Sequence, residues 1–207
     1  MPSLALYVAA SLALIATPGQ DMLYVMARAL AQGRRAGFCS ALGVCIGILV
    51  HTALAALGVG ALLRASESLF LAVKVAGAAY LVYLGARMLL SATPRARALA
   101  APRPLSPLEL VGQGILSNVG NPKIVVFFVA FLPQFVDPAS PHPTRDLVLL
   151  GALYAAMALP IKGAVAWITA SLARRAAPSL RTLAWLQRTS GTILVGLGLK
   201  LALPGSR

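Results

Sequence analysis

The stretch that decides the fold is ATPGQD, residues Ala16–Asp21, which places a helix breaker and a carboxylate inside a long apolar segment. Proline removes a backbone donor and clashes with the preceding turn, so we expect the helix to kink or unwind at Pro18-Gly19. A later apolar segment contains LSNVGNPK, residues Leu116–Lys123, where a breaker again lies beside a charge. Irregular backbone at membrane depth is tolerated only where protein buries it or where it lines a watery cavity. The sequence therefore predicts two broken helices.

The composition indicates an all-α integral membrane protein surrounded by the lipid bilayer. The chain has 207 residues, of which 59% are hydrophobic and 11% charged, and its mean hydropathy is +0.83. Soluble domains carry about 25% charged residues. The net charge of +13 could point to nucleic acid, but the basic residues sit in short loops between apolar runs, so we predict no nucleic-acid partner. The first apolar run lacks the basic start of a signal peptide and is predicted to stay as a helix.

Six segments are apolar over about 20 residues, the length at which a helix spans the hydrocarbon. We predict transmembrane helices at roughly Ser3–Met26, Phe38–Leu63, Leu69–Leu90, Leu110–Leu132, Leu147–Leu172 and Gln187–Leu203. They are expected to form a single transporter domain over residues 1–207, with the first and fourth helices broken.

The two halves of the chain resemble each other. Pro18 and Pro122 interrupt the first and fourth segments, and glycines recur in the third and sixth, although glycine and proline are common in transmembrane helices anyway. We therefore predict two three-helix repeats, one over about residues 1–92 and one over about 110–207, joined by a linker at 93–109. Because each repeat has an odd number of spans, the two must enter the membrane from opposite sides, as in transporters whose site lies between paired broken helices.

The distribution of basic residues predicts the orientation. The loops Arg28–Gly37, Ser91–Glu109 and Ala173–Leu186 hold three Lys or Arg residues each, whereas Arg64–Ser68 and Pro133–Asp146 hold one each. Short cytoplasmic loops are enriched in Lys and Arg. The three basic loops are therefore expected in the cytoplasm and both termini outside, although basic residues near the C-terminus weakly oppose this.

Four ionisable residues lie deep inside predicted spans: Asp21, His51, Lys123 and Lys162. Lys74 and Arg87 lie within about a turn of span ends and are expected to extend to the membrane surface. A charge at the bilayer centre costs at least about 2.5–3.5 kcal/mol, so such residues usually mark a functional pathway. Two lysines against one carboxylate leave a positive excess. That excess suits an anionic group such as a substrate carboxylate, or implies that one lysine is neutral through desolvation.

Each of these residues also has a structural interpretation. Asp21 can cap the half-helix that the break exposes, and Lys123 can extend along a shifted helix toward the membrane surface. Pro160 can admit water beside Lys162. A lone His51 on an apolar helix is more often a core residue bonded to a carbonyl than a functional group.

Two asparagines flank the second break. The amides of Asn118 and Asn121 can bond the carbonyls that Pro122 orphans, or can present donors and acceptors to a zwitterion. Cys39 and Cys45 have neither zinc nor disulfide spacing, so we predict no metal and no cofactor. No nucleophile lies near a base with enzyme-like spacing, and an enzyme is not expected.

Taken together, the motifs resemble the LysE/RhtB family of amino-acid exporters, and the resemblance covers essentially the whole chain. The matching residues are Thr17-Pro18-Gly19 with Asp21, QGRRAG at Gln32–Gly37, AGAAYL at Ala76–Leu81, Leu84-Gly85, Asn121-Pro122-Lys123, FLPQF at Phe131–Phe135 and Ser190-Gly191. Each motif alone is weak, but their order along six spans is specific. The sequence departs from the family at Gln20, where proline is common, and at Pro160–Lys162, where several relatives carry a carboxylate.

The resemblance implies a secondary transporter that exports amino acids or related small metabolites from the bacterial cytoplasm across the inner membrane. It also implies proton coupling and a homo-oligomer. The alternatives are an ion or metal exporter of related architecture and a membrane scaffold without transport. The predicted pathway residues are Thr17, Pro18, Gly19, Asp21, His51, Asn118, Asn121, Pro122, Lys123 and Lys162.

Overall fold

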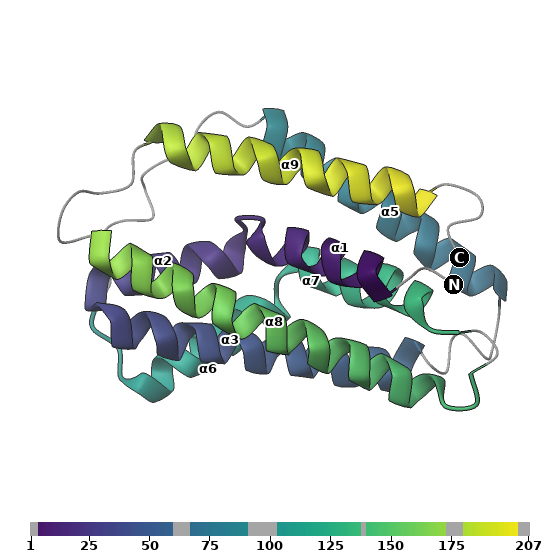
Figure 1. Cartoon of the computed structure of the whole chain (residues 1–207), viewed down its shortest axis with the longest axis horizontal. Helices are drawn as coiled ribbons and strands as arrows, with labels where there is room; N and C mark the ends of the chain where they lie inside the picture. Colours follow the sequence, from purple (N-terminus) through teal and green to yellow (C-terminus); the bar gives the residue numbers. More distant parts are fainter. Residues whose placement is uncertain (1–3, 60–66, 91–102, 138–139, 173–179, 203–207) are drawn as a thin grey trace.

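The computed structural model describes residues 4–59, 67–90, 103–137, 140–172 and 180–202, and these residues contain helices and connecting turns but no strand (Figure 1). The all-α prediction is confirmed for this part of the chain. Most of the predicted linker, residues 93–102, lies outside the described residues. So do most of the connections predicted at Arg64–Ser68 and Ala173–Leu186.

Both predicted breaks are present. α1 (Leu4–Ala16) and α2 (Gln20–Gln32) meet at an angle of 48° across Pro18-Gly19. α6 (Pro107–Val119) is bent by 54° from the segment Pro122–Phe135. That segment comprises α7 (Pro122–Val126), the π-helix η3 (Phe127–Phe131) and the 3-10 helix η4 (Leu132–Phe135). Each break follows from a proline that cannot continue the hydrogen-bond ladder of the helix before it.

The remaining described helices coincide with the other four predicted spans. They are α3 (Arg34–Leu54) with the π-helix η1 (Ala55–Val59), α5 (Glu67–Leu90), α8 (Pro143–Leu172) and α9 (Leu180–Ala202). Among the described residues, two helices are long and apolar enough to cross a membrane, Arg34–Gly58 and Pro143–Leu172, and each bent pair raises that number by one, to four. The structure thus supports two to four of the six predicted spans.

Small residues let the helices pack at backbone contact, among them Gly43 and Gly47. A Cβ atom on Gly43 would lie 2.2 Å from the Val111 carbonyl oxygen, and one on Gly47 would lie 2.7 Å from Asn118 Cβ. These contacts pair α3 with α6, running in the same direction. Any side chain at these two glycines would force α3 away from α6 and so displace Asn118.

The pairs α5·α9 and α3·α8 also meet at glycines, each pair running antiparallel. A Cβ on Gly85 would lie 2.6 Å from the Gly191 carbonyl oxygen, and one on Gly198 would lie 2.8 Å from the Ala78 carbonyl oxygen. In α3·α8, a Cβ on Gly37 would lie 2.7 Å from Ala166 Cβ, and one on Gly151 would lie 2.3 Å from Thr52 Oγ1. Figure 1 shows α5 and α9 side by side along one edge of the bundle.

The ends of the three basic loops meet at one end of the bundle. The Arg28 Nη1 donates to the Arg103 carbonyl oxygen at 3.3 Å, which joins the end of α2 to the start of α6. The Arg34 Nη2 donates to Ser171 Oγ at 3.0 Å, which joins the start of α3 to the end of α8. The start of α1 and the end of α9 lie at the opposite end in Figure 1. The described ends of the three basic loops therefore lie on one side, as the predicted topology requires.

Candidate functional site

The first break exposes backbone carbonyls, and the Lys123 ammonium group forms hydrogen bonds with two of them. The Lys123 Nζ donates to the carbonyl oxygens of Leu14 and Thr17 at 3.2 and 3.1 Å. These carbonyls belong to the last turn of α1, where orphan acceptors and the helix dipole favour a cation. A Cβ at Gly19 would lie 3.1 Å from the same nitrogen, so glycine keeps the approach open. Lys123 is buried, 7% exposed, and does not extend toward the membrane surface.

Asp21 and Asn118 form a second bridge between the broken helices. The Asn118 Nδ2 donates to Asp21 Oδ2 at 2.7 Å, and the two residues are 3% and 0% exposed. Hydrogen bonds to an ionised acceptor are about twice as strong as neutral ones. Asp21 Oδ1 and Asn118 Oδ1 are both buried and have no hydrogen-bond partner. Buried polar atoms are rarely left without a partner, so these two oxygens mark a place where a donor is expected.

At the breaks themselves, the Asn121 and Thr17 side chains form hydrogen bonds to nearby backbone groups, and one Asn121 atom is left without a partner. Asn121 Oδ1 accepts from the Lys123 backbone N–H at 3.1 Å, so Asn121 is the N-cap of α7 and Pro122 opens that helix. The Asn121 Nδ2 is buried without a partner. The Thr17 Oγ1 donates to the Ala13 carbonyl oxygen at 2.7 Å, which satisfies one carbonyl that Pro18 would otherwise orphan.

His51 is a core residue bonded to a carbonyl. Its Nε2 lies 3.2 Å from the Asn118 carbonyl oxygen, and its ring centroid lies 5.8 Å from that of Phe128. His51 therefore fixes the backbone that carries the Asn118 amide and does not contact Asp21.

Lys162 is buried on α8 and is 5% exposed. Sequence analysis missed Tyr154, which is also buried on α8, two helical turns before Lys162. α8 packs against both α2, which carries Asp21, and α3. Tyr154 could have been noticed from its eight-residue spacing to Lys162, which places both on one helix face.

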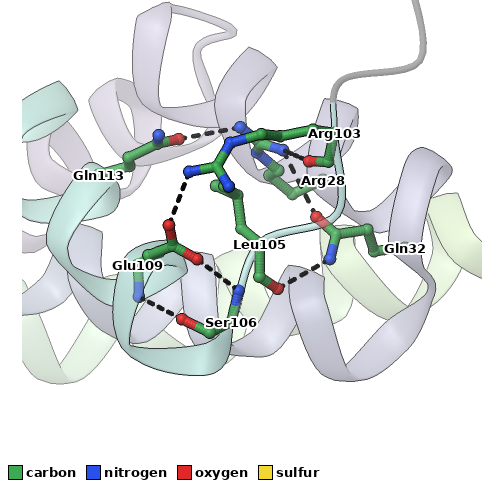
Figure 2. A network of polar contacts seen from close by, with 7 residues as sticks. All are labelled: Arg28, Gln32, Arg103, Leu105, Ser106, Glu109 and Gln113. Carbon is green, nitrogen blue, oxygen red and sulfur yellow. Dashed lines mark hydrogen bonds and ion pairs between the residues drawn. The ribbon is translucent and has the colours of Figure 1, made fainter.

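A row of polar contacts continues from Asp21 along α2, and sequence analysis missed it. The Tyr24 hydroxyl donates to the Leu110 carbonyl oxygen at 2.7 Å, the Arg28 Nη2 to Gln113 Oε1 at 2.9 Å, and the Gln32 Nε2 to the Leu105 carbonyl oxygen at 3.0 Å. Figure 2 shows the outer part of this row. We call Asp21, Tyr24, Arg28 and Gln32 with their partners in residues 103–118 the polar seam. Its signal in the sequence is the spacing of three or four residues, which puts all four on one helix face.

The seam ends at the capped start of α6. The Glu109 backbone N–H donates to Ser106 Oγ at 3.3 Å while Glu109 Oε2 accepts from the Ser106 backbone N–H at 2.8 Å, a capping box. These hydrogen bonds, with the ion pair to Arg103 at 2.8 Å, lower the pKa of the Glu109 carboxyl (Figure 2). The cap fixes the backbone of residues 103–109, from which Arg103 and Leu105 offer carbonyls to α2.

Comparison with known proteins agrees with this architecture. The family model of the LysE type translocator matches residues 12–205. The chain is 33% identical to an uncharacterized membrane protein of Pseudomonas aeruginosa over 201 residues, 95% of this chain and 93% of that protein. It is 33% identical to the leucine efflux protein of Salmonella typhimurium over 145 residues, 70% of this chain and 68% of that protein. No solved structure matches the chain.

The family model covers both breaks and the residues around Asp21. The matches make the protein a membrane transporter and not an enzyme. At the level of the family, they support export of amino acids. The chain belongs to the LysE type translocator family.

Proposed function

We propose that this protein is a secondary transporter that exports amino acids or related small metabolites across the bacterial inner membrane, coupled to protons. The observation that carries the proposal is the buried Asp21–Asn118 hydrogen bond between two broken helices. Broken helices in secondary transporters hold substrate and coupling ions near the bilayer midplane. Family membership supports the class of substrate.

The atoms without partners suit an amino-acid zwitterion. Asp21 Oδ1 and Asn118 Oδ1 are acceptors for an ammonium group, and the Asn121 Nδ2 is a donor on the neighbouring turn. An ammonium group brings three donors and no acceptor. Because the relatives include leucine efflux proteins, leucine is the first substrate to test, followed by other neutral amino acids.

The same carboxylate provides a route to proton coupling. One aspartate cannot readily hold a substrate ammonium and a proton together, so the two compete for Asp21. Exchange between them on opposite sides of the membrane links export to proton entry, provided that the site alternates between the two sides.

Alternation needs two related halves, and we propose the inverted three-helix repeat for this purpose. Gly198 stands 113 positions after Gly85, and Gly191 stands 113 positions after Ala78. The close approach of Gly85 to Gly191 is thereby matched by that of Gly198 to Ala78. In α3·α8, an offset of 114 relates Gly37 and Ala166 to Gly151 and Thr52. Such exchanged contacts are what a two-fold axis between repeats produces.

The polar seam indicates which side is closed. α2 and α6 run from the breaks to the end with the basic loops, and the seam joins them along that whole length. We infer that the site is closed toward the cytoplasm in this conformation. Export requires the seam to part so that substrate can enter from that side.

The proposed orientation can be tested by cysteine labelling. After replacement of Cys39 and Cys45, single cysteines are introduced at the exposed positions Pro104 and Pro141. We expect a membrane-impermeant maleimide to label Pro141→Cys in intact cells and Pro104→Cys only after permeabilisation, because the basic loops are cytoplasmic. Labelling of Pro104→Cys in intact cells would reverse the orientation.

Export itself is tested in cells loaded with dipeptides that release leucine or another neutral amino acid inside. Expression of the protein is expected to lower the intracellular pool and speed its appearance outside, and a protonophore is expected to remove this effect. Resistance to toxic amino-acid analogues provides a second readout. Unchanged pools with no resistance across the whole set would contradict amino-acid export.

A further inference from the structure

Lys162 is a buried lysine that takes no part in the described hydrogen bonds at the helix breaks or in the polar seam. It lies on the buried stripe of α8 formed by Tyr154, Ala158 and Lys162, which repeat every four residues. α8 packs against both α2 and α3. Lys162 is therefore buried where α8 packs against α2 and α3, and Asp21 is buried on α2.

Lys162 has no protein partner in the part of the chain that the structure describes. No hydrogen bond to its ammonium group occurs there, and no carboxylate oxygen lies within 4.0 Å of it. Asp21 accepts its hydrogen bond from Asn118 and not from Lys162. A buried charge is costly unless it is paired and hydrogen-bonded. An anion near Lys162 would remove that cost.

Lys123 does not fill the same role. The Lys123 Nζ donates to the carbonyl oxygens of Leu14 and Thr17 at the end of α1, which compensate its charge. Among the described residues, the buried charged side chains are Asp21, Lys123 and Lys162. With Lys123 engaged at the end of α1, the described interior offers one carboxylate, Asp21 on α2, and one free ammonium, Lys162 on the adjacent α8.

We propose that Lys162 binds the carboxylate of the transported amino acid while Asp21 binds its ammonium group. This rests on the proposed function, and it assigns the two ends of the zwitterion to α8 and α2. A charged hydrogen bond at each end makes the site selective for molecules that carry both groups. A substrate site built to bind a polar group rejects analogues that lack it far better than it rejects changes in apolar size.

The test compares L-leucine with L-leucinamide, which keeps the ammonium group and lacks the carboxylate. Both are offered as competitors of export, and as ligands that raise the melting temperature of the purified full-length protein. Lys162→Met keeps an unbranched chain without charge, and Lys162→Arg keeps the charge. We expect Lys162→Met to weaken leucine binding by about 10- to 100-fold, as expected for a charge-assisted hydrogen bond. Leucinamide binding should change less than about threefold by the same argument, and Lys162→Arg should keep most leucine binding.

The outcomes separate this proposal from the proposed function. If the unsubstituted protein exports none of the amino acids, the proposed function fails. If it exports leucine and Lys162→Met weakens leucine and leucinamide equally, Lys162 supports the fold and does not bind the carboxylate. Unchanged leucine affinity in Lys162→Met overturns the proposal as well. A variant that reaches the membrane poorly is still informative, because the melting-temperature shift is measured on the purified fraction and Lys162→Arg provides an independent comparison.

Discussion

Asp21→Asn is expected to reduce export by at least about tenfold and to make the remaining flux insensitive to the proton gradient, because the charged hydrogen bond and the titrating group are lost together. The amide has the shape of the carboxylate and can still pair with Asn118, so the bridge between the broken helices is kept. What disappears is the negative charge that Asp21 Oδ1 offers in the buried site. The measurement is efflux of a preloaded amino acid with and without a protonophore.

The matched control is Asp146→Asn. Asp146 lies in the first turn of α8 and accepts a hydrogen bond from Ser140 at 2.5 Å, away from both breaks. The substitution Asp146→Asn removes the same charge at the end of the bundle and should leave export unchanged. If Asp21→Asn, inserted at the level of the unsubstituted protein, exported with the same rate and the same response to the gradient, Asp21 would serve only the fold and coupling through it would be excluded.

The fold was largely predictable because the decisive rules are local. Proline removes a hydrogen-bond donor from a helix, and Pro18 and Pro122, each next to a glycine or an asparagine, located both breaks, whereas Pro160 lies within the continuous α8. Long apolar runs located the helices, and the structure places one helix or bent pair at each of the six segments.

The arrangement of the site was less predictable because it depends on contacts between distant residues. Asp21 and Asn118 are 97 positions apart, and no local pattern pairs them. The sequence left Lys123 and Lys162 both available to an anionic group, whereas the structure gives the Lys123 ammonium to carbonyls at the end of α1 that the break orphaned. Tyr24 and Arg28 were passed over because they lie at the end of an apolar span and just beyond it, although their spacing from Asp21 follows one helix face.

The second large effect is expected when a cross-link holds the two sides of the polar seam together. Cysteines at Arg28 and Gln113, whose side chains are hydrogen-bonded at 2.9 Å, can be joined by a short thiol-cleavable cross-linker in a background without Cys39 and Cys45. We expect cross-linking to stop export almost completely and a reducing agent to restore it. The reason is that α2 and α6 must separate at this end for substrate to reach Asp21 from the cytoplasm.

The single variants Arg28→Cys and Gln113→Cys, treated with the same reagent, control for the loss of the hydrogen bond and for modification of one thiol. Loss of the Arg28–Gln113 contact alone should change export by less than about threefold, because an exposed polar pair contributes little and Tyr24 and Gln32 still join the two helices. Full export by the cross-linked pair would mean that α2 and α6 stay together throughout the cycle. The access route would then lie between α2 and α8, and Lys162, not the seam, would line it.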